Sequence, residues 1–470
     1  MRDVRSVMTK VVRLGVLLCA LLLTPAAADA APRKLTFKVG PINVNGYEVK
    51  QNNIDIGIPK PDVDGHITAM EADLVDVQGR PMPIERLMLH HIVFANLGSQ
   101  LGDKKDASCD TFTGLDSVQK IPAMAERFYG AGEERATMQL PGGYGYPVAK
   151  DDIWTLTWMV MNHRAVSDKA FIQYTVTVDD DAALTPVKPV WLDVRNCRAD
   201  PVYDVPGGGA PGSTHSEVSD WRAPYDGRIV AGGGHVHGGA KDLRLSQPDC
   251  GDRQIARSRP TWGNPDHPFY NVKPVLHEPG PINMSGFGTS QGFPVKAGER
   301  LRLTSNYDAE LPHTRVMGIM IVFLAEGGGP QCGTLPTDVA ETTSALPGRT
   351  TTPRVTVPLT GLDARGRART ISRPPGKTKR FAGNAKVRVG DTFFSLRNLS
   401  VRRGARVSWS FTGRQLHDVT VASGPRGFSS PHRGRGGRFA KKLDVPGTYR
   451  LFCSLHPVAM TQRITVRRGG

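Results

Sequence analysis

The chain has 470 residues, which is long enough for about three domains, each with a core of its own. The formal net charge is +16, and it is concentrated in residues 333–470, which contain 26 Lys and Arg against 6 Asp and Glu. A chain this basic can bind nucleic acid, but the export signal described next argues against that class of partner. We interpret the charge as a solvated basic surface, with an acidic cell envelope or an acidic redox partner as the functional alternatives.

Residues 1–30 have the pattern of a secretory signal peptide. Four basic residues precede an apolar stretch over 14–23, and Ala28 and Ala30 provide a small-x-small cleavage site. The apolar stretch is too short to span a membrane permanently. We therefore expect a secreted or extracytoplasmic protein, periplasmic or at the cell surface.

The next three hundred residues alternate short apolar-polar runs with Gly and Pro turns, and they contain no long amphipathic helix. Runs such as WTLTWMVM over 154–161 and VMGIMIVFLA over 316–325 are typical of strands. The pattern predicts an all-β fold with two jelly-roll-like β-sandwiches, 31–190 and 191–332, joined near 187–195. Residues 333–385 are rich in Thr, Pro and Arg without periodicity, and we expect a linker there.

The cysteines indicate disulfides. Apart from Cys19 in the leader and Cys453 near the C-terminus, the chain contains Cys109, Cys197, Cys250 and Cys332. An even set in an oxidising compartment predicts up to two disulfide bonds. Three pairings are open, and a bond between Cys197 and Cys332 would join the two ends of the middle domain.

Several histidines in the first two domains are candidate metal ligands. His90 and His91 are adjacent, so on a regular strand they point to opposite faces, and joint ligation needs a strand end or different ring nitrogens. His163 closes an apolar run, where a buried structural histidine is the commoner role. His235 and His237 share one face of a strand and are flanked by glycines.

Methionines add a soft donor late in the same region. Met317 lies on a late strand, where core packing is its ordinary role. Met320 points to the opposite side of that strand, so at most one of the two methionines serves a site.

Taken in order, these residues resemble the copper type II, ascorbate-dependent monooxygenases, the family of the peptidylglycine and dopamine monooxygenases. The likeness spans most of 35–332 and includes LPGGYGYPV before His163 and PVKAGERLRLTSNY before Met317. The segments HHIVFAN, FYGAGEER and GYGYPV are also similar to the stress-induced, Nod19-like proteins.

The monooxygenase resemblance implies two copper ions, with ascorbate as a reductant. His90, His91 and His163 would hold the copper that stores electrons. His235, His237 and Met317 would form the catalytic site, where O2 binds and a C–H bond is hydroxylated, and the thioether would favour Cu(I). The two ions would face each other across a cleft between the sandwiches.

The substrate is expected to differ from that of the peptide-amidating members of this family. Those members place an Arg two residues before the His-x-His, where this chain has Gly233. Their polar residues after the methionine are replaced by Ile319 and Ile321. We therefore expect an unknown organic substrate that is less polar or larger than a peptide carboxylate.

Near the C-terminus, Cys453, His456 and Met460 lie in one short segment, LFCSLHPVAM, and His417 lies upstream in QLHDVTV. Two imidazoles, a thiolate and a weaker thioether are the ligand set of blue, type 1 copper sites. A buried free cysteine beside incidental histidines is the structural alternative.

The strands around these residues are short, alternating and broken by Gly and Pro, which predicts a small Greek-key β-sandwich. Over roughly 386–468 the chain resembles the cupredoxins, the plastocyanin-like blue copper proteins. The resemblance gives ligand roles to His417, Cys453, His456 and Met460, with the axial distance to Met460 left open. We therefore expect a cupredoxin domain over 386–470.

Three functions remain open from the sequence. The first is an exported copper monooxygenase that draws electrons from its own blue copper domain, a redox partner or a small-molecule reductant. The second is a non-catalytic copper-binding or electron-transfer protein, and the third makes the first two sandwiches adhesion modules without metal. The remaining histidines lack partners at ligand spacing and are expected at the surface or in turns: His66, His215, His267, His277, His313 and His432.

Overall fold

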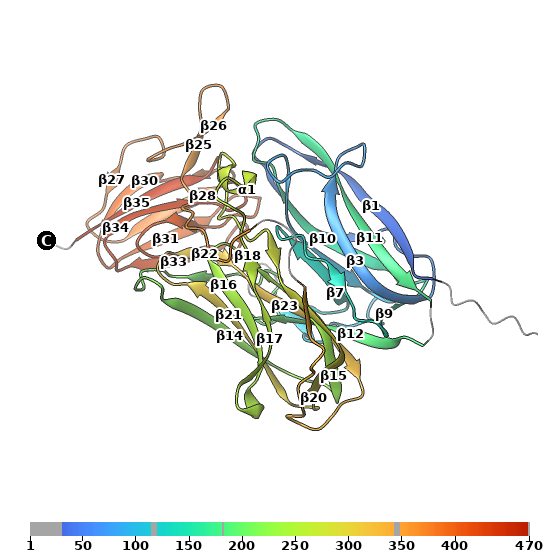
Figure 1. The fold of residues 1–470 in the computed structure, drawn as a ribbon. Coiled ribbons are helices and arrows are strands. Elements are labelled where there is room, and N and C mark those ends of the chain that lie inside the picture. The colour runs from blue at the N-terminus through green and yellow to red at the C-terminus, as the bar shows by residue number, and fades with distance from the viewer. Residues whose placement is uncertain (1–30, 114–119, 181–182, 343–347, 469–470) are drawn as a thin grey trace, which may run out of the picture.

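The computed structural model describes residues 31–113, 120–180, 183–342 and 348–468. The expected signal peptide and Cys19 lie outside the described residues. As predicted, the fold is all-β, with three sandwich-like modules packed around a common centre (Figure 1). In the described ranges, no helix is long and apolar enough for a membrane span.

The first module consists of two facing sheets whose inner side chains, including Phe94, Tyr146 and Trp154, form one buried core. Alternating apolar residues on these strands point inward, as the sequence predicts. One sheet contains β1 (Arg33–Val44), β11 (Asp168–Asp179), β3 (Gly65–Val75), β8 (Met138–Gln139) and β9 (Tyr144–Val148). The other contains β2 (Val49–Ile56), β10 (Trp154–Met161), β4 (Met88–Asn96) and β7 (Glu126–Gly132), and a hairpin is formed by β5 (Thr111–Thr113) and β6 (Lys120–Pro122).

The first and second modules share a sheet, because β12 (Thr185–Asp193) pairs with β9 on one side and with β23 (Gly318–Glu326) on the other. The expected boundary near 187–195 therefore falls in a strand that contributes to both cores: Val187 packs in the first core, and Val190 and Leu192 pack in the second. The sheet continues through β15 (Gly227–Val236), β20 (Gly286–Val295) and β24 (Ala340–Thr342).

The second module is completed by a four-stranded sheet and several short elements. The sheet contains β14 (Thr214–Arg222), β21 (Arg300–Asp308), β16 (Ala240–Gln247) and β17 (Arg253–Ser258). The short elements are β13 (Tyr203–Val205) with β22 (His313–Val316), β18 (Pro260–Thr261) with β19 (Asn283–Met284), the 3-10 turn Pro248–Cys250 and α1 (Pro268–Asn271).

The C-terminal module is a separate sandwich with its own core around the fully buried Trp409. Both sheets mix parallel and antiparallel pairs, and the parallel pairs are joined by long crossover connections. One contains β27 (Lys379–Arg380), β30 (Asn398–Arg402), β35 (Thr461–Arg467), β34 (Gly447–Phe452) and β32 (Thr420–Ser423); the other contains β29 (Phe393–Phe394), β28 (Ala385–Gly390), β31 (Ala405–Phe411) and β33 (Arg438–Leu443).

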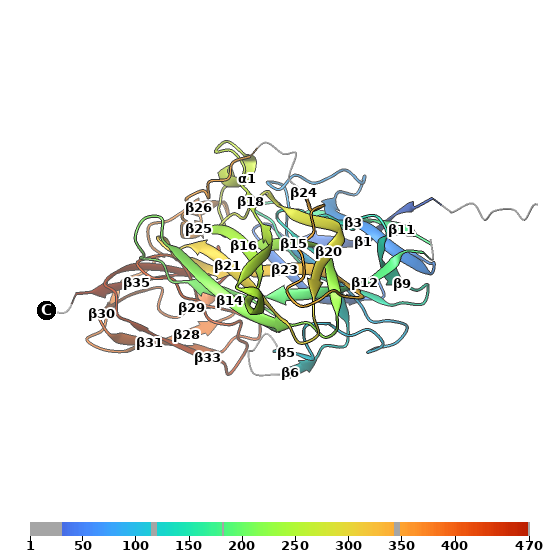
Figure 2. The ribbon, with the colours of Figure 1, turned by 60° about the horizontal axis from the view of Figure 1, so that its bottom comes forward.

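The stretch 333–385, expected as a linker, is packed against the modules in its described part. β24 pairs with the edge of β20, and Figure 2 shows the two strands together. Leu359 is buried, and the hairpin of β25 (Thr360–Leu362) and β26 (Ala368–Thr370) reaches the first module, where Ala368 N donates to the hydroxyl of Tyr47 at 2.9 Å. The apolar residues between the prolines of this stretch make packing contacts, which its composition alone did not predict.

The two disulfides join Cys109 to Cys197 and Cys250 to Cys332. The pairing of Cys197 with Cys332 that would join the ends of the middle domain is therefore wrong. Cys197 follows β12 and lies against a loop of the first module, whereas Cys332 lies beside the turn that contains Cys250. Each bond thus fastens a segment to its spatial neighbour.

Candidate metal centres

The loop 453–460 is closed on itself between β34 and β35. His456 N donates to the carbonyl of Cys453, Met460 N donates to that of His456, and Cys453 N donates to that of Met460, each at 3.0 Å. These three backbone bonds form a compact turn of the chain with Cys453 at its base. These bonds give the loop a defined backbone shape.

Three of the four expected ligands meet where this loop contacts His417, which precedes β32. The Sγ atom of Cys453 lies 3.6 Å from Nδ1 of His456 and 3.9 Å from Nδ1 of His417. His417 and Cys453 are fully buried, and the donor atoms of the three residues lie within 4.8 Å of one another. Met460 is fully buried in the same core. A soft thiol between two imidazole nitrogens fits a copper ion.

The surroundings orient these donors. The outer nitrogen of His417, Nε2, lies 3.1 Å from a carboxylate oxygen of Asp391, which turns Nδ1 toward the cysteine. The amide of Asp418 points at Sγ of Cys453 from 3.5 Å. Burial raises the pKa of the Cys453 thiol well above its ordinary value. The proton is therefore released only when a cation replaces it.

In the first module, a β-bulge brings His90 and His91 to the same side. His91 pairs with Met159 and Leu89 pairs with Val160, so His90 is the extra residue on β4. The two rings lie 5.2 Å apart. On a regular strand these adjacent side chains would point to opposite faces. The bulge interrupts this alternation, so both imidazoles can face the same site.

His163 lies two residues after the end of β10 and is buried. Its turn is held by Asn162, whose side-chain amide donates to the carbonyls of Asn45 and Val166 at 3.0 and 2.8 Å. Burial lowers the pKa of His163 to about 3, and burial together with the neighbouring His90 lowers that of His91 to about 3. Both imidazoles are therefore neutral at ordinary pH, the state that binds metals.

The end of β15 supplies the second pair. His235 directs Nδ1 to the carboxylate of Glu134 at 3.0 Å, and Gly132 leaves room for this approach because a Cβ there would lie 2.6 Å from the imidazole. The Tyr307 hydroxyl accepts a bond from His237 N at 2.8 Å and donates to the Met317 carbonyl at 2.7 Å. Tyr307 thereby fixes the backbone of His237 next to that of Met317.

The two predicted copper sites form one histidine cluster rather than two sites across a cleft. The rings of His90 and His237 are 5.2 Å apart, as are those of His235 and His237. We use the term histidine cluster for His90, His91, His163, His235, His237 and His277. Five ring nitrogens in it are buried with no hydrogen-bond partner among the described residues: His91 Nδ1, His163 Nδ1, His235 Nε2, His237 Nε2 and His277 Nδ1.

Three of the histidines expected at the surface or in turns instead lie in the interior beside carboxylates. His277 lies 5.0 Å from the His90 ring, and its Nε2 contacts Glu133. His313 is buried against Glu278 at 2.8 Å, and His432 is buried near Asp200. Their partners come from other elements, so the spacing of residues in the sequence did not predict these contacts. The glutamates in FYGAGEER and HEPG were the only sequence feature that indicated acidic partners for buried histidines.

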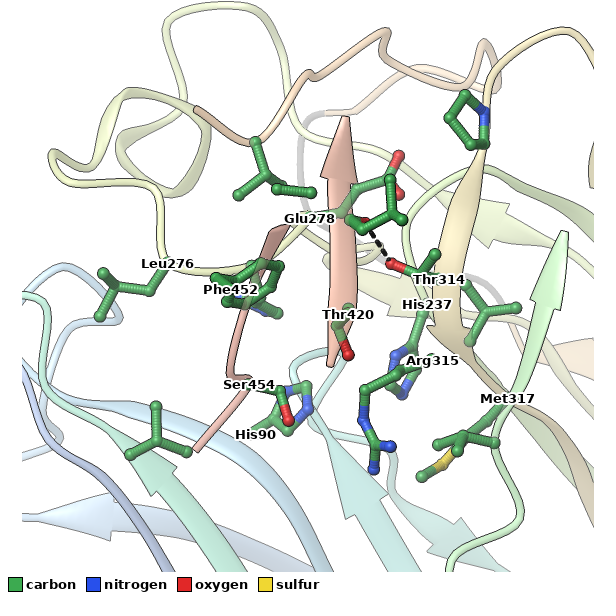
Figure 3. Close-up of a pocket in the computed structure, with 18 of the residues that line it drawn as sticks. His90, His237, Leu276, Glu278, Thr314, Arg315, Met317, Thr420, Phe452 and Ser454 are labelled. Atoms are coloured by element: carbon green, nitrogen blue, oxygen red, sulfur yellow. Dashed lines mark hydrogen bonds between the residues drawn. The ribbon is translucent and has the colours of Figure 1, made fainter. Parts of the chain in front are cut away.

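A cavity of about 210 Å³ separates the histidine cluster from the C-terminal module. His90, His237 and Met317 line it from the first two modules, and Phe452 and Ser454, on either side of Cys453, line it from the third (Figure 3). Met317 is buried but faces the cavity, whereas Met320 is fully buried in the second core. The rest of the lining combines polar and charged residues with these apolar ones: Val49, Met159, Met161, Val202, Leu276, Leu311, Val316, Val355, Val357 and Val421.

Arg315 bridges the modules at this cavity. Its guanidinium donates to Asp200 at 2.5 Å and lies 3.6 Å from Asp418, and the Asp418 carboxylate accepts bonds from the amide and hydroxyl of Ser454 at 2.6 and 2.7 Å. The ion pairs are almost fully enclosed, and an unpaired carboxylate would be costly in such a low-dielectric region. Arg315 provides the compensating charge for both Asp200 and Asp418. The loop 453–460 is thereby fastened to the second module.

The chain matches the family model SURNod19, described as Stress up-regulated Nod 19, over residues 154–327, which run from β10 of the first module through β23 of the second. This range contains His163, His235, His237, His277 and Met317. A small part of the chain has distant similarity to cupredoxins.

Among curated proteins, amicyanin-alpha of Methylorubrum extorquens is 28% identical over 79 residues, which are 16% of this chain and 66% of amicyanin-alpha. The chain thus spans slightly less than two thirds of that relative. Among solved structures, the purple cupredoxin of Nitrosopumilus maritimus is 25% identical, covering 18% of this chain and 99% of that chain with a TM-score of 0.17. Reduced auracyanin of Roseiflexus castenholzii is 16% identical, with 18% and 98% covered and a TM-score of 0.17.

Proposed function

We propose that the protein is an exported copper-binding oxidoreductase whose C-terminal site exchanges single electrons with the histidine cluster. The similarity to amicyanin-alpha supports copper binding and electron transfer in the C-terminal module. The observation that carries the coupling is the shared cavity: the residues on both sides of Cys453 line the same space as His90, His237 and Met317.

At the C-terminal site, His417, Cys453 and His456 would hold the copper, with Met460 as the weaker axial donor. A bound copper supplies one-electron oxidation and reduction with little change of geometry. The protein keeps water away from it. Leu455 and Val458 of the loop pack with Met88, Met161 and Leu276 of the first two modules, so the side facing the cluster is apolar.

In the histidine cluster, His91 and His163 offer neutral, unpartnered nitrogens on one side, and His235 and His237 offer theirs on the other. With His90 and with Met317, these are the sets that the family resemblance assigns to two further copper ions; the donor nitrogens of His90, His91 and His163 do not all lie within 4.8 Å of one another, so the first set would have to draw together to hold an ion. Copper here would supply the reduction of O2. The finer proposal is that this reaction hydroxylates a C–H bond of an organic substrate, with ascorbate or another reductant as the electron source.

The cavity favours an apolar substrate. Valine, leucine and methionine supply eleven of its lining residues and histidine supplies five, and its charged groups are paired: Arg315 with Asp200, and Glu278 with His313, which lies outside the lining. No free cation in the described lining is placed to bind a carboxylate. This agrees with the absence of an arginine at Gly233, and an apolar group of moderate size would fill the cavity.

The alternative is a copper-binding electron-transfer protein that hydroxylates nothing. It is favoured by one observation. The two expected copper sites lie in one cluster, and His90 directs Nδ1 to Glu133 rather than to a metal position shared with His91 and His163. In that case the cluster would be a second redox or metal-storage centre.

Metal analysis combined with optical and paramagnetic resonance spectra tests the proposal. We expect about three copper ions per purified mature chain, one of them giving an intense blue absorption that disappears in Cys453→Ser. A blue protein with one copper per chain would leave only the electron-transfer alternative. A colourless, copper-replete protein with Cys453 intact would contradict both.

A further inference from the structure

One carboxylate oxygen in the histidine cluster faces two imidazoles. Glu133 Oε1 lies 2.9 Å from Nδ1 of His90 and also contacts Nε2 of His277. All three donor atoms lie within 4.8 Å of one another. Glu133 is buried, with 8% of its surface exposed, so water does not screen this contact. The three residues come from a turn after β7, the bulge of β4 and the loop after α1.

The second oxygen of Glu133 is held by the backbone. Gly280 N donates to Glu133 Oε2 at 2.6 Å. A Cβ at position 280 would lie 2.7 Å from that oxygen, so the close approach depends on glycine. With Oε2 engaged by an amide, Oε1 alone is directed at His90 and His277. This arrangement is that of a preorganised ligand whose orientation is set before an ion binds.

We propose that His90, Glu133 and His277 form a metal site for a borderline divalent first-row ion such as Zn2+. Two imidazoles with one carboxylate suit zinc and ferrous iron and lack the soft donor of the other two sets. Nδ1 of His90 serves this site, which leaves only Nε2 of that ring for a second ion. The site goes beyond the proposed function, because it requires neither copper nor electron transfer.

A purely structural hydrogen-bonded triad is the competing explanation, and one feature weighs against it. His90 and His277 line the cavity, which an ion could enter, whereas a packing role needs no such access. The nitrogen of His277 that this site would not use, Nδ1, is buried with no partner among the described residues.

The test is a Zn2+ titration of the full chain in a Cys453→Ser background, which removes the thiolate site. We expect one ion per chain whose affinity falls at least tenfold in Glu133→Gln and in His277→Asn. Glu278→Gln is the matched control, because the neighbouring Glu278 pairs with His313 instead, and it should leave that affinity within twofold of the parent. Equal loss in the control, or none in the two variants, overturns the assignment.

A second measurement needs no change at the site. X-ray absorption of the Zn2+-loaded Cys453→Ser chain should show two imidazoles and one carboxylate oxygen on zinc. A spectrum without a carboxylate contribution contradicts the proposal. Zinc is redox-inert, so this result is separate from the copper proposal, which fails on the blue absorption and the copper count.

Discussion

Met460 is the weakest of the four donors expected at the C-terminal site, and its thioether would act mainly on the reduction potential of a bound copper. The residue is fully buried in the core that contains Cys453, and its carbonyl accepts the amide of Cys453. In type 1 sites the axial ligand tunes the reduction potential. We predict that Met460→Leu keeps the blue absorption and raises the reduction potential in a redox titration, because the weak donor stabilises Cu(II). An unchanged potential would show that Met460 is not a ligand.

Asp338 gives a pH dependence that is independent of metal. Hydrogen bonds from Ser290 and Thr289 lower its pKa to about 2, from a model-peptide value of 3.8. Because the folded pKa is the lower one, the stabilisation is present above pH 3.8 and is lost as the pH falls toward 2. We predict that Asp338→Asn lowers the unfolding free energy at pH 6, and that the difference from wild type shrinks between pH 4 and 2 in denaturant titrations. A difference that grows on acidification would contradict this sign.

At the level of elements, local sequence patterns predicted the strands and the grouping of donors in the C-terminal loop. Contacts between residues far apart in the sequence could not be predicted. Cys453, His456 and Met460 share one loop, so their spacing in the sequence is their spacing in space. Glu133 and His277 meet across 144 residues, and nothing near either one indicates the other. The β4 bulge is likewise absent from the alternation of residues, because its cause is the pairing with β10.

The same limit applied to the disulfides, and it leads to a prediction. The bond between Cys109 and Cys197 closes a loop of 88 residues that fastens the end of β12 to the first module. Removing such a cross-link increases the entropy of the unfolded chain by an amount worth about 3–5 kcal/mol. We expect Cys109→Ser with Cys197→Ser to lower the unfolding free energy by about this amount in denaturant titrations. A loss below about 1 kcal/mol would mean that the loop is constrained by other contacts.

At the scale of the whole molecule, the function depends on how the C-terminal module sits on the other two. The described part of 333–385 packs against all of them, so the modules are held by contacts as well as by chain connection. Arg315, with its partners Asp200 and Asp418, is the ionic part of this interface. An electron-exchanging site held in place needs no diffusional encounter with its partner.

Arg315→Met is the variant that tests docking. Losing the guanidinium removes the principal cationic partner of two buried carboxylates, which costs about 3–5 kcal/mol. We predict that the blue absorption persists while the C-terminal module becomes sensitive to limited proteolysis within 333–385. Arg302→Met, which removes a partly exposed partner of Asp220 outside 333–385, is the matched control and should leave the proteolysis pattern unchanged. Equal resistance of the two variants would show that the ion pairs do not hold the interface.

The most direct test of the account is the rate at which O2 reoxidises the prereduced blue copper, followed by its absorption in a rapid-mixing experiment. We predict reoxidation in the native chain that is at least tenfold slower in the double variant His235→Ala, His237→Ala, with the blue absorption of that variant unchanged. Equal rates in the two proteins would contradict electron exchange between the C-terminal site and the histidine cluster.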